Sequence, residues 1–114
     1  MNCPDIRNLR LSDASLKAIE RIKRKPGLAK ALQGSMAGGQ IVNIFVSPTP
    51  PAATLYSIHS ADWVTFATAL SGIPAIARAS MQTEAYNEWI ESQLRNNFAE
   101  SQFWKAVYDG CLFR

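Results

Sequence analysis

The chain of 114 residues is 47% hydrophobic and 18% charged, with twelve lysine and arginine residues against nine aspartate and glutamate residues. This composition excludes an intrinsically disordered chain, and the length predicts one globular domain over residues 1–114. The longest apolar run, at 41–46, is far shorter than the ~18 residues of a membrane span. Residues 1–10 lack the apolar stretch of a secretory signal, so we expect a cytoplasmic protein.

Positive charge is concentrated at the N-terminal end. Residues 1–30 contain eight of the twelve cationic residues but three of the nine acidic ones, which gives this part a formal charge of +5, whereas residues 31–114 carry −2. Such an asymmetry is typical of a surface that meets an acidic partner, but a solvated helix face gives the same pattern.

The first predicted helix runs from Asp13 to Arg24. Ser12 is a good N-cap, and Pro26 stops the helix and can open a second one. Leu16, Ile19 and Ile22, at steps of three, give the first helix an apolar stripe. Leu28, Ala31, Leu32 and Met36 predict a second helix, which Gly38 and Gly39 end.

A β-hairpin is predicted in the middle of the chain. Residues 41–46 are β-branched and apolar, 47–51 are rich in proline, and 54–58 fit a returning strand. Because a lone hairpin is marginal in water, helices must cover at least one of its faces.

Three further helices follow. Ser60 opens the first, with Trp63, Phe66, Ala67 and Leu70 on one face. Residues 75–81 fit a short helix, a loop or the entry of a helix. Thr83 is expected to cap a longer helix in which an aromatic and aliphatic stripe steps by four (Tyr86, Ile90, Leu94, Phe98), and a final helix ends at Gly110.

The resulting order, α-α-β-β-α-α-α, predicts an α+β, helix-rich single domain with a small antiparallel β-hairpin packed on helices. Helix, short turn, helix and hairpin is also the order of a winged helix-turn-helix domain. That family usually presents three helices before the wing, and this chain has two. The similarity is one of element order.

The basic residues have three interpretations. They form a solvated face with Glu20 and Arg24 as a local pair, they neutralise phosphates of a nucleic acid, or they bind an acidic protein partner. The solvated face is the default. The candidate residues for nucleic-acid or acidic-partner binding are Arg7, Arg10, Lys17, Arg21, Arg24 and Lys25.

Candidates for catalysis are few. His59 is the only histidine, and Asp62 follows it at a strand-to-helix junction, where a carboxylate can orient an imidazole as a general base. The sequence offers no nucleophile motif and no glycine-rich phosphate loop, so we expect no cofactor. Glu84, Glu88 and Glu91 share a helix face, but without histidine partners a solvated face is favoured over a metal site.

The cysteines and aromatic residues carry weaker signals. Cys3 and Cys111 are expected to be free thiols, and a single histidine excludes the common structural zinc sites. The aromatic residues are dense for this length, and core packing is the default interpretation. As interface candidates for a partner or a homodimer we name Trp104, Leu112 and Phe113.

With no catalytic constellation, surface recognition is the function that the sequence favours. We expect a non-enzymatic accessory protein of the inhibitor, immunity or adaptor type, bacterial or phage-like, that docks a macromolecular partner, most readily a protein. A nucleic-acid-binding protein and a small enzyme that uses His59 are the alternatives.

Overall fold

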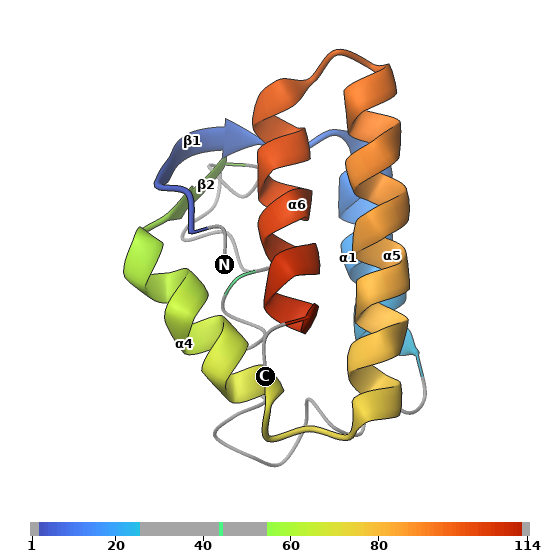
Figure 1. Cartoon of the computed structure of the whole chain (residues 1–114). Coiled ribbons are helices and arrows are strands. Elements are labelled where there is room, and N and C mark those ends of the chain that lie inside the picture. Colours follow the sequence, from blue (N-terminus) through green and yellow to red (C-terminus); the bar gives the residue numbers. More distant parts are fainter. Residues whose placement is uncertain (1–2, 26–43, 45–54, 113–114) are drawn as a thin grey trace.

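The computed structural model describes residues 3–25, 44 and 55–112. In chain order its elements are β1 (Ile6–Arg10), α1 (Asp13–Arg24), β2 (Leu55–Ile58), α4 (Ser60–Leu70), α5 (Ala75–Leu94) and α6 (Phe98–Leu112). Helix α6 lies at the centre, with α5 antiparallel on one side, α4 crossing on the other, and α1 behind α5 (Figure 1). The predicted α+β class with a small antiparallel sheet is confirmed. The predicted second helix lies outside the described residues.

Helix α1 has the predicted bounds because its end signals are strong. Ser12 is extended, and its Oγ accepts a hydrogen bond from the N–H of Ser15 at 3.4 Å. The buried face holds Ala18, Ile19 and Ile22, so the predicted apolar stripe is confirmed in its main part.

The sheet joins β2 to a strand that the sequence did not predict. Strands β1 and β2 pair antiparallel, with Ile6 opposite Ile58 and Leu9 opposite Tyr56. An irregularity between Ile6 and Leu9 contains Asn8, whose φ of 53° is left-handed. The predicted partner strand at 41–46 lies outside the described residues, except for Ile44, which is buried in a turn.

The prediction that Thr83 caps a long helix is wrong. Helix α5 begins eight residues earlier, at Ala75, and the Thr83 hydroxyl donates to the carbonyl of Ala79 at 3.0 Å inside the helix. The helix ends at Leu94, where Asn96 adopts a left-handed φ of 59°. The N–H groups of Asn96 and Asn97 then donate to the carbonyls of Gln93 and Ser92, which is a Schellman ending without glycine.

The predicted end of the last helix at Gly110 is also wrong. Helix α6 continues through Gly110 to Leu112 because this glycine serves a close contact between helices instead of a helix end. A Cβ atom at Gly110 would lie 2.7 Å from Cε2 of Phe66 on α4, well inside van der Waals contact.

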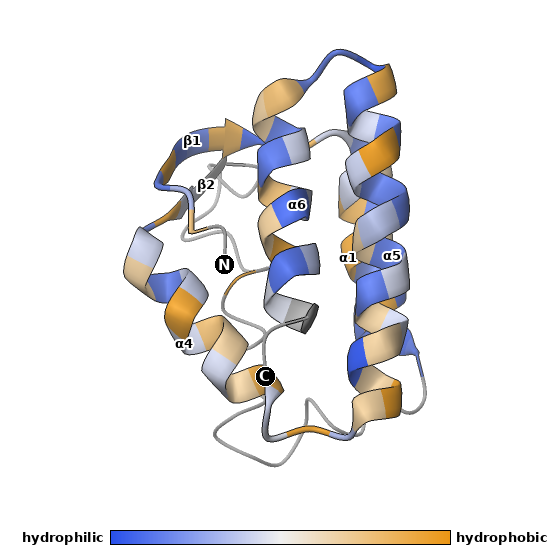
Figure 2. Ribbon diagram, in the orientation of Figure 1, coloured by the Kyte–Doolittle hydropathy of each residue, from blue (hydrophilic) through white to orange (hydrophobic). Residues whose placement is uncertain are grey.

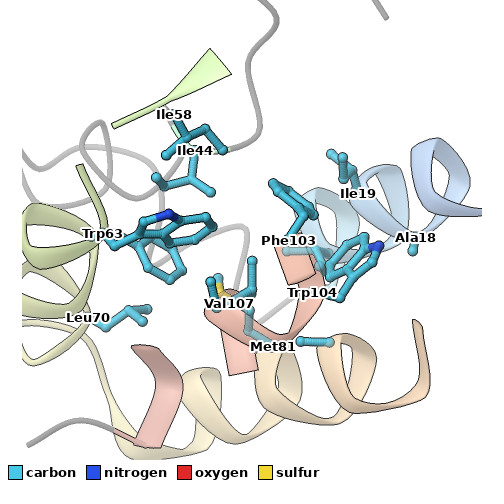
Figure 3. Close-up of a cluster of buried hydrophobic side chains, with 14 of the residues drawn as sticks. Ala18, Ile19, Ile44, Ile58, Trp63, Leu70, Met81, Phe103, Trp104 and Val107 are labelled. Atoms are coloured by element: carbon cyan, nitrogen blue, oxygen red, sulfur yellow. The ribbon is translucent and has the colours of Figure 1, made fainter. Parts of the chain in front are cut away.

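One hydrophobic core lies between the helices and the sheet. Its largest members, Trp63, Phe66, Phe103 and Trp104, are fully buried and pack through edge-to-face contacts (Figure 3). The indole N–H of Trp63 donates to the carbonyl of Pro4 at 2.8 Å, which attaches the N-terminal segment to α4. None of the helices that the structure describes is long and apolar enough to cross a membrane.

Candidate functional site

Two of the candidate cations, Arg21 of α1 and Lys25 at its C-cap, lie against acidic residues of α5. Nε and Nη2 of Arg21 lie 3.4 and 3.3 Å from Glu84 Oε2, and Lys25 Nζ lies 3.4 Å from Glu84 Oε1. Nη2 of Arg21 is also 3.8 Å from Oε2 of Glu88. Two of the six candidate cations are therefore engaged within the chain by carboxylates of a neighbouring helix.

The prediction that Glu84, Glu88 and Glu91 form a solvated face of α5 is wrong for two of the three. The side chains of Glu84 and Glu88 are only 13% and 9% exposed, whereas a solvated face was predicted for them together with Glu91. They are covered because α1 packs on this side of α5, which periodicity within α5 alone cannot show. Only Glu91 of the three is exposed.

The other candidate cations lie on the surface. Arg24 is 81% exposed and lies 3.9 Å from Glu20, so the predicted local pair is confirmed. Arg7 lies 3.6 Å from Asp5, and Arg10 and Lys17 are exposed. Surface pairs of this kind contribute little to stability and leave the cations accessible to a partner.

A groove lies between α1 and α5, with a volume of about 520 Å³. Three cations line it, Lys17, Arg21 and Arg95, together with the carboxylates of Glu88 and Glu91. Burial raises the pKa of Glu88, an effect that the nearby guanidinium groups of Arg21 and Arg95 oppose. Oε1 of Glu88 is buried and accepts no hydrogen bond from the described part of the chain.

His59 and Asp62 do not form the predicted contact between imidazole and carboxylate. Oδ2 of Asp62 accepts from the backbone N–H of His59 at 2.8 Å, so the carboxylate caps helix α4. The imidazole is 73% exposed, and its Nδ1 lies 3.5 Å from Oδ1 of Asp5.

A buried polar network that the sequence analysis missed is centred on Glu100 of α6, which is fully buried. Its Oε1 accepts hydrogen bonds from the hydroxyl groups of Ser12 and Ser15 at the start of α1. Its Oε2 accepts from Asn97 Nδ2 at 2.7 Å, and Trp104 Nε1 donates to Ser15 Oγ at 2.8 Å. The signal in the sequence is Asn97 followed by Glu100, the spacing of a capping box.

Of the three interface candidates, Trp104 is excluded from that role. Its indole is 0% exposed and is covered by the chain itself, because the side of α6 that carries it faces α1 and the core. The side chain of Leu112 and the whole of Phe113 lie outside the described residues.

The apolar stripe predicted on the long helix is on the outside of the molecule. Tyr86 is 47% exposed and Leu94 is 74% exposed, with Ile90 half-buried between them. Phe98, the first residue of α6, is 68% exposed just beyond the turn. We call these four residues the α5 stripe. Figure 2 shows hydrophobic residues interspersed with hydrophilic ones along the visible face of α5.

An aromatic cluster adjoins the α5 stripe and shares Tyr86 with it. The rings of Tyr86, Trp89 and Tyr108 have centroids 5.7–5.9 Å apart. Nζ of Lys105 lies 4.9 Å from the centroid of the Trp89 ring and 2.8 Å from Oδ1 of Asp109. Mutual packing and the cation over the ring hold Tyr86 in a defined position while almost half of it stays exposed.

Within the described part of the chain, no group of three or more histidine, cysteine, aspartate or glutamate side chains is placed to hold a metal ion. The α5 stripe and the groove between α1 and α5 each present a defined set of side chains on the surface. No family model, curated protein or solved structure matches this chain.

Proposed function

We propose that this chain is a non-enzymatic binding protein that docks another protein through the α5 stripe. The observation that carries the proposal is the exposure of Tyr86 and Leu94 on α5 and of Phe98 at the start of α6, at 47%, 74% and 68%. Single apolar residues on a surface are ordinary, whereas several large ones along one helix and the turn after it are the kind of exposed apolar surface that marks an interaction site.

The composition of the α5 stripe and its surroundings favours a protein as the partner. Tyrosine and tryptophan are enriched among interface residues that carry most of the binding energy. Tyr86 is held by its contacts with Trp89 and Tyr108, so little side-chain entropy is lost when a partner covers it.

We further propose that the partner surface is apolar and acidic. The chain carries a net charge of +3, and the carboxylates of Glu84 and Glu88 are engaged with Arg21 of α1. A carboxylate-bearing partner is attracted by the positive charge of residues 1–30, which include helix α1 beside α5. The inhibitor, immunity and adaptor types remain alternatives for what the docking achieves.

The nucleic-acid alternative stays a prediction. Exposed Lys17, Arg10 and Arg24 support it, and the engagement of Arg21 and Lys25 by Glu84 weakens it. It predicts duplex affinity that falls steeply with added salt. Replacement of Lys17, Arg21 and Arg24 together by glutamine tests it: unchanged affinity, or no measurable affinity of the natural chain, contradicts nucleic-acid binding.

The enzyme alternative also stays a prediction, with less support. A general base needs a positioned imidazole, and the Asp62 carboxylate bonds to the backbone of His59 instead.

Photo-cross-linking tests the docking proposal and identifies the partner in the same experiment. A photoreactive amino acid replaces Leu94 in one variant and Ile76 in a control, since Ile76 is equally exposed, at 78%, on the same helix. The two positions are 18 residues apart, about 27 Å along the axis. We expect a discrete adduct from the Leu94 position alone, whose cross-linked peptide carries apolar side chains flanked by aspartate or glutamate.

Two results contradict the proposal. Adducts that are identical at both positions, or absent from both, remove the α5 stripe as a docking site. An adduct of two copies of the chain keeps the stripe as an interface but contradicts the acidic partner.

A further inference from the structure

The groove between α1 and α5 contains a carboxylate that the fold leaves incompletely satisfied. Glu88 is 7% exposed and lines the groove, and its buried Oε1 has no hydrogen-bond partner among the residues that the structure describes. Its other oxygen lies 3.8 Å from Nη2 of Arg21, which is ion-pair distance but too long for a hydrogen bond. Buried polar groups in folded proteins nearly always have a partner, so this acceptor is available to a donor that enters the groove.

The surroundings of Glu88 favour the charged form only in part. Arg21 and Arg95 attract its negative charge, Glu84 and Glu100 repel it, and burial raises the pKa of the carboxyl. Arg95 also lies 3.7 Å from Glu100, and Arg21 is shared with Glu84, so neither guanidinium belongs to Glu88 alone. A further positive donor would offset the cost of burying this carboxylate.

Two cations that line the groove are accessible to a ligand. Lys17 is exposed and forms no ion pair with any residue that the structure describes, and the side chain of Arg95 is 37% exposed. These cations can receive an anionic group, while the carboxylates of Glu88 and Glu91, which line the same groove, can receive a cationic one.

We propose that the groove between α1 and α5 binds a small zwitterionic molecule, whose ammonium group contacts the carboxylates of Glu88 and Glu91 and whose acidic group contacts Lys17 and Arg95. A volume of about 520 Å³ accommodates a molecule of amino-acid size. The two charged ends of the ligand match the two charge types of the lining, which neither a simple anion nor a simple amine does.

This site is independent of the proposed docking function. The groove lies on the side of α5 that packs against α1, and none of the residues of the α5 stripe lines it. A variant in one surface is therefore expected to leave binding at the other unchanged, and each proposal can fail without the other.

Nuclear magnetic resonance titration of the full chain with 6-aminohexanoate tests the proposal. This probe has an ammonium at one end and a carboxylate at the other, and hexylamine and hexanoate each keep one of the two groups. We expect saturable shifts of backbone amide signals around Lys17 and Glu88, with affinity for either single-group analogue lower by about tenfold or more. Glu88→Gln removes the charge at constant size and is expected to weaken binding by a similar factor, whereas Glu20→Gln, on α1 but outside the groove, leaves it unchanged.

Three outcomes overturn the zwitterion site. They are the absence of saturable shifts, equal binding of hexanoate and 6-aminohexanoate, and unchanged affinity in Glu88→Gln. The first of these would mean that water alone satisfies Glu88 Oε1. Should Glu88→Gln fail to fold, Lys17→Met replaces it, because Lys17 is exposed and its loss removes the proposed contact with the acidic group.

Discussion

At the scale of single residues, Gly110 decides how closely α6 approaches α4. Its ideal Cβ position lies 2.7 Å and 2.9 Å from two atoms of the Phe66 ring, and both residues are buried. The ring of Phe66 is enclosed in the core and has little room to move away.

We predict that Gly110→Ala destabilises the fold by up to about 2 kcal/mol. Overpacking costs about 1–3 kcal/mol, and the ~1 kcal/mol that alanine gains over glycine in a helix offsets part of that cost. Urea unfolding measures the difference. In a Phe66→Leu background the same substitution is expected to cost less, because the clashing ring is gone; an equal cost in both backgrounds would argue against the contact.

Glu88 is the residue at which pH is expected to act on the fold. Burial raises the pKa of this carboxyl above its usual value of 4.5, so the folded state holds the proton more tightly than the unfolded state. The contribution of Glu88 to stability is therefore most favourable below about pH 4.5 and is lost as the pH rises through the raised pKa.

Glu88→Gln removes this dependence on pH. We predict that the variant gains stability relative to the natural chain as the pH rises from about 4 to about 8, so that its free energy of unfolding exceeds that of the natural chain by an increasing amount. Urea denaturation at several pH values gives the difference. A difference that stays constant, or that falls with pH, is incompatible with a raised pKa.

At the scale of elements, Glu100 connects α6 to the start of α1. The carboxylate accepts from the hydroxyl groups of Ser12 and Ser15 and from Asn97, so it completes the caps of two helices at once.

We predict that Glu100→Ala lowers the free energy of unfolding by about 3–5 kcal/mol, because buried donors lose their acceptor. Chemical denaturation measures this cost, with Glu91→Ala on exposed α5 surface as the control, expected within about 0.5 kcal/mol of the natural chain. Similar losses in both variants would contradict the role of the network.

The elements that the sequence predicts well are those with local end signals. Helix α1 follows from the Ser12 cap and Pro26, and the buried face of α4 follows from Trp63, Phe66 and Leu70. Strand β1 was missed because the left-handed Asn8 interrupts the alternation between Ile6 and Leu9, and because its partner lies about 50 residues away in sequence.

Which face of α5 is buried could not be predicted from the sequence, for a different reason. The side that packs inward carries Ala77, Ala85 and Ser92, and small residues let helices approach closely. The larger stripe, with Leu94, was then left outside. Hydrophobic spacing identifies a face, but the fit between neighbouring helices decides which face is buried. The burial of Glu88 and of Glu100 likewise depends on helices that meet only in the folded chain.

At the scale of the whole molecule, the chain has a dense aromatic core, two buried carboxylates and an apolar stripe on the surface. The exposed stripe is costly in water, and docking of a partner removes that cost. The proposed function therefore depends above all on the α5 stripe being the binding surface.

The most direct test is the affinity of the cross-linked partner, once isolated, for variants of the stripe. Isothermal titration is expected to show binding about thirtyfold weaker for Leu94→Gln, as for an interface residue worth about 2 kcal/mol, and unchanged for Ile76→Gln. Both side chains are equally exposed, so the fold should tolerate both changes. Equal affinities of the two variants and the natural chain would contradict the α5 stripe as the docking surface.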